Sequence, residues 1–228
     1  MFNPLAYLIH WLFPPTCAVC GQNNTNWCDD CQYKIKKRPL ICPLCDKAQD
    51  QQILCTACAN QTSLDKILVS ATYLDGGLDK VIHAFKYQYH SQLAVPLAQL
   101  LIQRYQNIDM PDNCLIIPTP LHRRRYNERG FNQAELLANH FGLALKIPVK
   151  TNILHRKKYN DHQANLNRQQ RLINVANSFS ISKNIDLADQ TIILIDDVIT
   201  TGATLDEQAK LLKQNNARAV WALVLAKN

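Results

Sequence analysis

Apolar residues follow two different patterns along the chain, and their alternation predicts an α/β fold. Ile192–Ile195 and Cys114–Pro118 are short continuous apolar runs, typical of strands buried on both faces of a parallel sheet. Lys66–Leu74 is predicted as a further strand. Apolar residues at helical spacing predict helices that pack on this sheet. These helices are expected over Gly77–Tyr87, Leu93–Tyr105, Phe131–Phe141 and Leu205–Asn215.

Two acidic residues and a hydroxyl-rich turn follow the run at Ile192–Ile195. Asp196 and Asp197 fall at the carboxyl end of the expected strand, where open α/β sheets bind ligands. The turn consists of Thr200, Thr201, Gly202, Ala203 and Thr204. Because it leads into a helix, its backbone N–H groups and the helix dipole favour a phosphate. Two adjacent carboxylates repel a phosphate, so they are expected to face sugar hydroxyls or a divalent metal.

An ordinary strand, turn and helix with a solvated acidic pair is the alternative to this site. A lone Gly-Thr turn would favour that alternative. Here the buried strand, the acidic pair and the hydroxyl-rich turn occur in the order that a ribose 5-phosphate site requires. The complete arrangement therefore favours a binding site.

An arginine-rich segment follows the run at Cys114–Pro118. Pro118 and Pro120 exclude a helix here, so Thr119–Arg125 is predicted to be a turn at the same edge of the sheet as the acidic pair. Guanidinium groups donate paired hydrogen bonds to phosphate oxygens. The residues expected to bind pyrophosphate are Leu121, His122, Arg123 and Arg124. Lys86 and Tyr87, at the end of an earlier helix, are a further candidate ligand contact, although a solvated helix end is the simpler explanation.

The chain of 228 residues carries a formal net charge of +7, which is concentrated in one segment. Leu121–Arg171 contains 11 Lys and Arg against 3 Asp and Glu, whereas the rest contains 14 against 15. This suggests a polyanionic partner, either pyrophosphate or nucleic acid, although a run of charges is often just a solvated face. Candidate contacts with single-stranded DNA are Arg125, Arg129, Arg156, Lys157 and Lys158, with Tyr126 or Tyr159 as a stacking platform.

The polar, basic segment His155–Arg171 is longer than ordinary connections in compact domains, which predicts a lid over a binding site. His155 and His162 are candidates for acid–base chemistry only in principle, and a surface position is the better interpretation. Cys114, alone in its strand, is interpreted as a small apolar residue of the core.

Four C-x-x-C pairs near the N-terminus are typical of zinc sites, because the short turn lets both thiolates bind one ion. Disulfides are disfavoured, since the sequence has no secretory signal and a redox C-x-x-C is expected once rather than four times. Sequential pairing predicts two zinc ions, one on Cys17, Cys20, Cys28 and Cys31 and the other on Cys42, Cys45, Cys55 and Cys58. Interleaved pairing stays open, because spacing does not determine topology.

The segment that carries these pairs has few apolar residues, so zinc is expected to supply most of its folding free energy. A basic cluster between the second and third pairs favours a contact with nucleic acid, and a structural cover over the neighbouring domain is the alternative. The cluster consists of Lys34, Lys36, Lys37 and Arg38.

The N-terminal residues show neither a basic n-region nor a small-residue cleavage site, and the apolar run before Pro14 is too short to span a bilayer. We therefore expect a cytoplasmic protein without stable membrane insertion, whose N-terminal apolar stripe packs on the protein itself. The expected organisation is an N-terminal helix at 1–14, a double zinc ribbon at 15–61 and an α/β domain at 62–228.

Thr191–Thr204, with the letters T-I-I-L-I-D-D-V-I-T-T-G-A-T, resembles the phosphoribosyl pyrophosphate motif of type I phosphoribosyltransferases. The resemblance implies a phosphoribosyltransferase-like parallel sheet flanked by helices. It also implies that Asp196 and Asp197 contact the ribose hydroxyls with Mg²⁺ close by, while Thr200–Thr204 bind the 5-phosphate.

Further motifs narrow this resemblance to the ComF family over nearly the whole chain. They are F-P-P-x-C-x-x-C-G, H-A-F-K-Y, P-L-H-R-R-R-x-x-E-R-G-F-N-Q-A and the Q-x-x-L-x-R-x-x-R spacing from Gln163 to Arg171. Members of the family combine an N-terminal double zinc ribbon with a C-terminal phosphoribosyltransferase domain. The resemblance implies a role in natural transformation, inside the cell, on incoming single-stranded DNA.

Three functions fit these features. The first is an enzyme that transfers a ribosyl group from Mg²⁺-bound phosphoribosyl pyrophosphate to a nucleobase or another nitrogen acceptor. The second is a binding module that keeps the phosphate site as a nucleotide sensor and handles single-stranded DNA in competence. The third is an adaptor whose zinc ribbons recruit competence or recombination proteins. The acceptor separates the first two, and the sequence does not identify a purine or pyrimidine pocket.

Overall fold

The computed structural model describes residues 14–36, 38–49, 54–105, 108, 111–158, 177–183 and 185–228, and every structural statement below concerns these. The predicted N-terminal helix at 1–14, apart from Pro14, lies outside them. So do residues 159–176, which make up most of the predicted lid, with His162 and Tyr159 among them.

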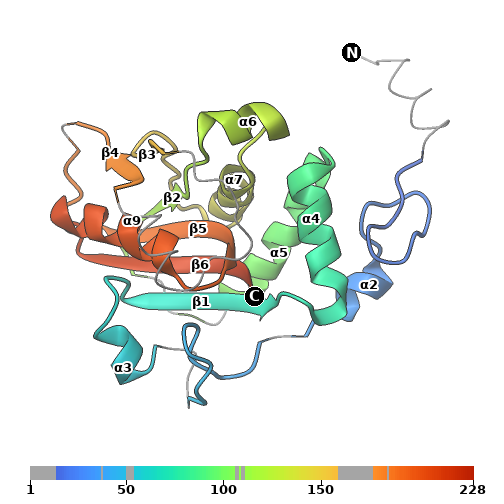
Figure 1. The fold of residues 1–228 in the computed structure, drawn as a ribbon, viewed down its shortest axis with the longest axis horizontal. Coiled ribbons are helices and arrows are strands. Elements are labelled where there is room, and N and C mark those ends of the chain that lie inside the picture. The colour runs from blue at the N-terminus through green and yellow to red at the C-terminus, as the bar shows by residue number, and fades with distance from the viewer. Residues whose placement is uncertain are drawn as a thin grey trace.

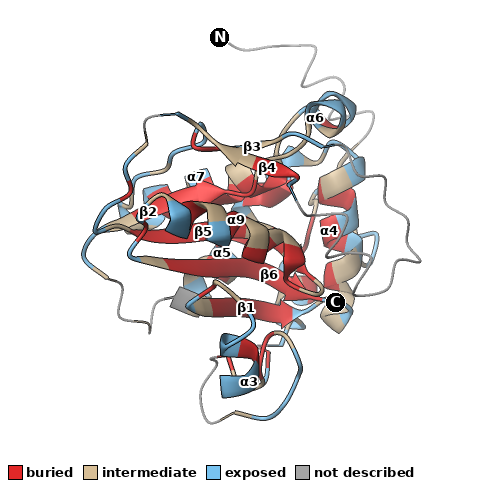
Figure 2. Cartoon of the chain, turned by 60° about the vertical axis from the view of Figure 1, so that its left-hand side comes forward, coloured by how far each residue is buried: buried red, intermediate tan, exposed pale blue. Residues whose placement is uncertain are grey.

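The described residues form a parallel four-stranded sheet with the strand order β1-β6-β5-β2. The strands are β1 (Lys66–Thr72), β2 (Cys114–Pro118), β5 (Thr191–Ile199) and β6 (Ala219–Lys227). β5 and β6 are the central strands, and both are almost entirely buried, as their continuous apolar runs require (Figure 2). The predicted α/β class is confirmed.

Helices cover both faces of this sheet (Figure 1). α4 (Leu78–Tyr87), α5 (Ala94–Tyr105) and α7 (Gln133–Leu145) pack on the face that carries Ile193 and Ile195. α9 (Ala203–Gln214) packs on the other face, against Ile192 and Leu194. Successive residues of β5 therefore enter two separate cores, as the alternation of side chains along a strand dictates.

The remaining elements are short. They are α2 (Asp29–Tyr33), α3 (Thr56–Ala59), η1 (Asp75–Gly77), η2 (Ser91–Leu93), α6 (Arg123–Arg129) and the antiparallel pair β3 (Leu154–Arg156) and β4 (Phe179–Ile181). Among the described helices, none has both the length and the apolar character needed to cross a membrane.

Two predicted boundaries are wrong in an informative way. The turn predicted over Thr119–Arg125 ends early, because α6 begins at Arg123, where His122 Nδ1 accepts a hydrogen bond from the Arg124 N–H. Pro118 and Pro120 exclude a helix only around themselves, and α6 starts beyond them. β5 is longer than predicted and contains Asp196 and Asp197, because β6 continues to pair with it as far as Ile199.

The eight N-terminal cysteines form two sets of four, and within each set the Sγ atoms lie within 4.8 Å of one another. The sets are Cys17, Cys20, Cys28, Cys31 and Cys42, Cys45, Cys55, Cys58, which confirms the sequential pairing. Four converging thiols are the donor set that a structural zinc ion prefers, so each set fits Zn²⁺. We call residues 16–36 the first zinc segment and residues 38–49 with 54–60 the second.

The two zinc segments join the protein on opposite sides of the sheet. Cys17, Cys28 and Cys31 belong to the core that contains α4 and α5. Cys42 and Cys58 belong to the core that contains α9. In Figure 1 the first segment accordingly lies beside α4, whereas the second, which includes α3, lies below β1.

Candidate functional site

The candidate site lies where β5 extends beyond its neighbour β2. The pairing of these strands ends at Pro118 and Ile195, and the Thr119 N–H still donates to the Ile195 carbonyl at 2.9 Å. From Asp196 to Ile199, β5 pairs only with β6. The edge of β5 that faces β2 is therefore open at the two aspartates, which is where open α/β sheets bind ligands.

Asp196 and Asp197 have different surroundings at this open edge. Asp197 is buried, and its Oδ1 lies 2.7 Å from Lys86 Nζ. Asp196 accepts a hydrogen bond from the Asp197 N–H at 2.8 Å. Burial, and then the negative charge of Asp197, raises the pKa of Asp196 to about 7, although Lys86 and Arg156 act in the opposite direction. The ionised form of this carboxyl is poorly stabilised by its surroundings, so a bound cation or hydroxyl donor would stabilise it.

The start of α9 follows directly, and its N-cap residue has no side chain that could cap it. Gly202, with φ of 80°, is the N-cap of α9 and contributes no side chain to the first-turn N–H groups. Thr201 Oγ1 accepts from the Ala203 N–H at 3.4 Å. N–H groups of a first helical turn lack partners within the helix, so this turn offers donors to an anion.

The segment after β2 supplies the facing wall. Thr119 is buried, and its hydroxyl donates to Gln208 Oε1 of α9 at 3.4 Å, while its carbonyl accepts from Asn132 Nδ2 at 3.1 Å. Beyond it a shallow pocket is lined by His122, Arg123, Arg124, Asn127 and Glu128. Three of the four residues predicted to bind pyrophosphate line this pocket, and Leu121 adjoins it in sequence.

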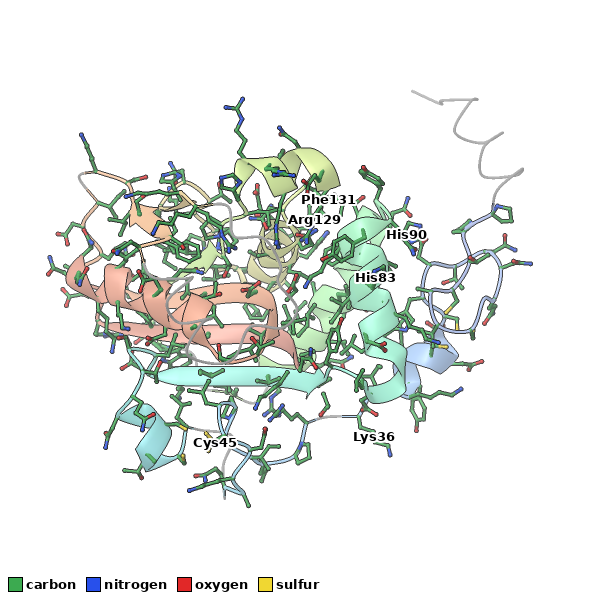
Figure 3. The ribbon with its side chains drawn as sticks, viewed as in Figure 1. Lys36, Cys45, His83, His90, Arg129 and Phe131 are labelled. Carbon is green, nitrogen blue, oxygen red and sulfur yellow. The ribbon has the colours of Figure 1, made fainter. Side chains whose placement is uncertain are left out.

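The carboxyl end of α4 is fastened to α6 and α7. Arg129 donates to Gln133 Oε1 at 2.9 Å and to the Tyr87 hydroxyl at 3.3 Å, and its guanidinium lies 4.9 Å from the centre of the Tyr87 ring. Figure 3 labels Arg129, whose side chain lies below α6. Tyr89 donates to the Glu128 carbonyl at 2.9 Å. Arg129 is buried, so it does not belong to an exposed DNA-binding surface as the sequence suggested. It holds the helix that delivers Lys86 to Asp197.

The other predicted DNA contacts lie on α6 and at the end of β3. Arg125 is half-buried, whereas Lys157 and Lys158 are exposed. Arg156 lies over the Phe179 ring at 5.4 Å, and burial, followed by the charge of Arg125, lowers its pKa. Arg156 also acts electrostatically on Asp196, so β3 brings a cation to the site.

Among the remaining residues, His155 lies at the surface as the sequence suggested, whereas Cys114 is less buried and Arg38 more buried than expected. His155 is exposed and hydrogen-bonds to Ser182 at 2.7 Å, as a surface histidine should. Cys114 is only partly buried, and its thiol donates to the Pro111 carbonyl at 2.9 Å. Arg38 is buried and paired with Asp46, so it does not belong to an exposed basic cluster, whereas Lys34 and Lys36 are at the surface.

Some residues that build the site were not identified from the sequence. Thr119 and Gln208 join the segment after β2 to α9, and Asp206 accepts from Thr62 and Ser63 near the start of α9. These pairs are separated by 89, 144 and 143 positions. No local pattern reports such contacts, and only the H-A-F-K-Y motif hinted at the role of Lys86.

The pKa of Asp196 leads to a prediction about stability. The raised pKa means that folding takes up a proton between about pH 4 and pH 7, so Asp196 lowers the free energy of unfolding as pH rises through this window. Asp196→Asn stays neutral and keeps an acceptor for the Asp197 N–H. We expect it to stabilise the zinc-loaded, ligand-free protein by about 1 kcal/mol or more at pH 8, and less at pH 6.

Urea unfolding followed by circular dichroism at both pH values measures this difference. The matched control is Asp112→Asn, an exposed carboxylate, which should follow the wild type at each pH. A variant Asp196→Asn that is less stable than the wild type at pH 8 would rule out the assigned environment.

Two family descriptions match separate parts of the chain. Residues 8–59 match the double zinc ribbon domain, and residues 127–228 match the phosphoribosyl transferase domain. The first range contains both cysteine sets, and the second contains α7, β5, the aspartates and α9. The chain thus combines a double zinc ribbon with a phosphoribosyltransferase domain.

Curated relatives match over most of their length. Competence protein F of Haemophilus influenzae is 35% identical over 225 residues, covering 92% of this chain and 96% of that protein. DNA utilization protein YhgH of Escherichia coli K12 is 29% identical, with coverage of 92% and 96%. Competence protein ComFC of Bacillus subtilis is 29% identical over 88% of this chain and 84% of its own. The agreement of both domains and of nearly the whole chain shows that this protein belongs to the ComF family of competence proteins.

Proposed function

We propose that the open edge of β5 binds Mg²⁺-phosphoribosyl pyrophosphate, and that the protein serves DNA uptake by handling incoming single-stranded DNA in the cytoplasm. The observation that carries the first part is that the acidic pair of β5, with Asp197 buried and Asp196 half-buried, lies beyond the last residue paired with β2 and is followed by the start of α9, whose N-cap Gly202 has no side chain. One end of this site suits hydroxyls and cations, and the other suits a phosphate.

The ligand's ribose 5-phosphate fits these two ends. Asp196 and Asp197 would accept hydrogen bonds from the ribose hydroxyls, and the amides and hydroxyls of Thr200–Thr204 would bind the 5-phosphate. Lys86 now neutralises Asp197 at 2.7 Å, so the hydroxyls would compete with it or share the carboxylate. The half-buried Arg156 reinforces the positive potential around the ligand.

The pyrophosphate would lie against Leu121–Arg124, where α6 begins. Arg123 is exposed at this helix start and faces the shallow pocket. Mg²⁺ fits the carboxylate oxygens of Asp196, whose pKa is raised by burial and by the adjacent negative charge of Asp197, because a cation beside this pair would offset both effects. When bound, Mg²⁺ would supply charge neutralisation between that carboxylate and the pyrophosphate oxygens.

Removing the acidic pair should abolish this binding selectively. Asp196→Asn together with Asp197→Asn keeps side-chain shape but loses both charges, and Thr201→Val loses one hydroxyl donor. We expect at least tenfold weaker binding of Mg²⁺-phosphoribosyl pyrophosphate in each, because hydrogen bonds to charged groups contribute about 1.5–3 kcal/mol. Titration calorimetry measures the affinity.

Thr151→Val, which also removes one exposed hydroxyl but lies between β2 and β3, serves as the matched control and should bind normally. Wild-type affinity in all three variants would remove the assignment of the site. Release of labelled pyrophosphate on addition of a panel of nucleobases would show that the same site also transfers the ribosyl group, which is the enzymatic alternative.

The DNA part of the proposal rests on the relatives and on surface charge. Relatives with 29–35% identity are named for competence or DNA utilization. Arg123, Lys157 and Lys158 are exposed, and Tyr126 exposes 48% of its surface. α6 and β3 lie on the same side of the molecule in both views (Figures 1 and 2). Cations beside an exposed aromatic ring suit single-stranded DNA, whose bases stack without sequence preference.

Charge reversal on this side should weaken DNA binding in a salt-dependent way. We expect Arg123→Glu with Lys157→Glu to reduce the slope of log affinity against log salt by about 1.4, since each neutralised phosphate on a single strand contributes about 0.7. Fluorescence anisotropy with a labelled oligonucleotide measures the slope. Lys80→Glu with Lys150→Glu makes the same charge change at other exposed positions and should leave it unaltered.

Equal slopes in the two double variants would exclude this surface as the DNA site. DNA binding that instead disappears when zinc is removed, with the α6 and β3 cations intact, would assign DNA to the zinc segments and leave the basic residues to pyrophosphate.

A further inference from the structure

The second zinc segment lies directly against the loop proposed to bind the 5-phosphate. Leu44 immediately precedes the zinc ligand Cys45, and its Cδ2 would be 2.8 Å from a Cβ added to Gly202. Gly202 is the N-cap of α9 and adopts a φ of 80°. The side chain of Leu44 therefore covers the backbone of the phosphate loop at its left-handed residue.

Two ion pairs fix the same zinc segment to the end of the sheet. Asp46, which follows Cys45, pairs with Lys227 Nζ at 2.7 Å and with Arg38. Both cations are buried. Lys227 lies in β6 opposite Ile199, the last residue of β5 before the loop. Asp46 thus connects the zinc segment to the strand pair from which the phosphate loop starts.

The far side of the loop is held by the chain that leaves the second zinc segment. Asp206 Oδ1, in the first turn of α9, accepts from the Thr62 hydroxyl at 2.9 Å and from the Ser63 N–H at 2.6 Å. Lys210 pairs with the other oxygen of Asp206 at 2.8 Å. In the core, Cys42 and Cys58 share one apolar cluster with Ile199 and Leu205, which flank the loop.

The first zinc segment docks in the same manner, but on a different helix. Val19 immediately precedes the zinc ligand Cys20, and its Cγ1 would lie 2.7 Å from a Cβ on Gly77, the N-cap of α4 with φ of 81°. The Lys36 N–H donates to Asp75 at 2.8 Å nearby. Lys86 lies at the opposite end of α4, so this contact is remote from the phosphate loop.

We infer that the second zinc site is a working part of the phosphate site: Leu44 positions the Thr200–Thr204 loop, and zinc and a ribose 5-phosphate bind with positive cooperativity. The inference rests on the proposed binding of phosphoribosyl pyrophosphate. Without zinc the short second segment loses most of its folding free energy, and the loop then loses contacts at Gly202 and Asp206 together. The ligand must then order the loop when it binds. Because this ordering uses part of the binding free energy, the ligand binds more weakly.

The test compares Leu44→Ala with Val19→Ala in the full-length, zinc-loaded chain. Both residues occupy the position before the second cysteine of a C-x-x-C pair and cover an N-cap glycine, so they are matched. We expect both variants to keep two zinc ions per chain. Leu44→Ala should speed amide hydrogen exchange at residues 200–206 and weaken ribose 5-phosphate binding about fivefold or more, whereas Val19→Ala should change neither.

Leu44→Met, which keeps the apolar contact, should restore both properties. If Leu44→Ala loses zinc instead, the zinc-loaded wild type answers the question by chelator-driven zinc release. In a chelator titration at equilibrium, ribose 5-phosphate should raise the zinc affinity of one site of the two, because the linkage of binding free energies is reciprocal, and Val19→Ala should not remove this effect.

Unchanged exchange at residues 200–206 in Leu44→Ala, or an equal change in zinc affinity at both sites, would overturn the inference while leaving the proposed ligand in place. A wild-type protein that binds neither ribose 5-phosphate nor phosphoribosyl pyrophosphate would refute the proposed function and with it the ligand half of the cooperativity. The effect of Leu44→Ala on amide exchange would then still test whether Leu44 positions the Thr200–Thr204 loop.

Discussion

The unequal length of two neighbouring parallel strands is the constraint on which the rest of this structure depends. β5 continues to Ile199 with β6 as its partner, after β2 has ended opposite Ile195. Two adjacent carboxylates lie there, and Lys86 pairs with Asp197, the more buried of the two, which offsets the cost of burying its charge. α4 packs on the sheet through its apolar face, and the Arg129–Tyr87 contact fixes the end of the helix that carries this cation.

The two zinc segments contact the starts of the helices on either side of the acidic pair. Each one uses an apolar residue beside a zinc ligand to cover a left-handed glycine that starts a helix, Val19 at Gly77 and Leu44 at Gly202. The metal sites are thereby tied to opposite faces of the sheet and to the two helices, α4 and α9, that frame the acidic pair. The role inferred for zinc at the second set is to order the loop at Gly202 in addition to folding the segment that binds it.

Local chemistry explains which features could be predicted from the sequence. The strand, acidic pair and hydroxyl-rich turn of Thr191–Thr204 are adjacent in the chain, so the fold class could be predicted from the sequence. The cysteine sets follow from short spacings, so their pairing could be predicted as well. The burial of Arg129 and Arg38 was not, because a basic residue is read as exposed until its distant partners, Tyr87 and Asp46, are known. The contact of Leu44 with Gly202 likewise joins segments that only the packed sheet brings together.

A crystal structure with Mg²⁺ and phosphoribosyl pyrophosphate tests the central claim most directly, because the claim concerns where each part of the ligand lies. The account predicts the 5-phosphate within hydrogen-bond distance of the Thr201–Thr204 amides, the ribose hydroxyls on Asp196 and Asp197, and a lengthened contact between Lys86 and Asp197. A ligand bound away from the open edge of β5, with the Lys86–Asp197 ion pair unchanged at 2.7 Å, would contradict it.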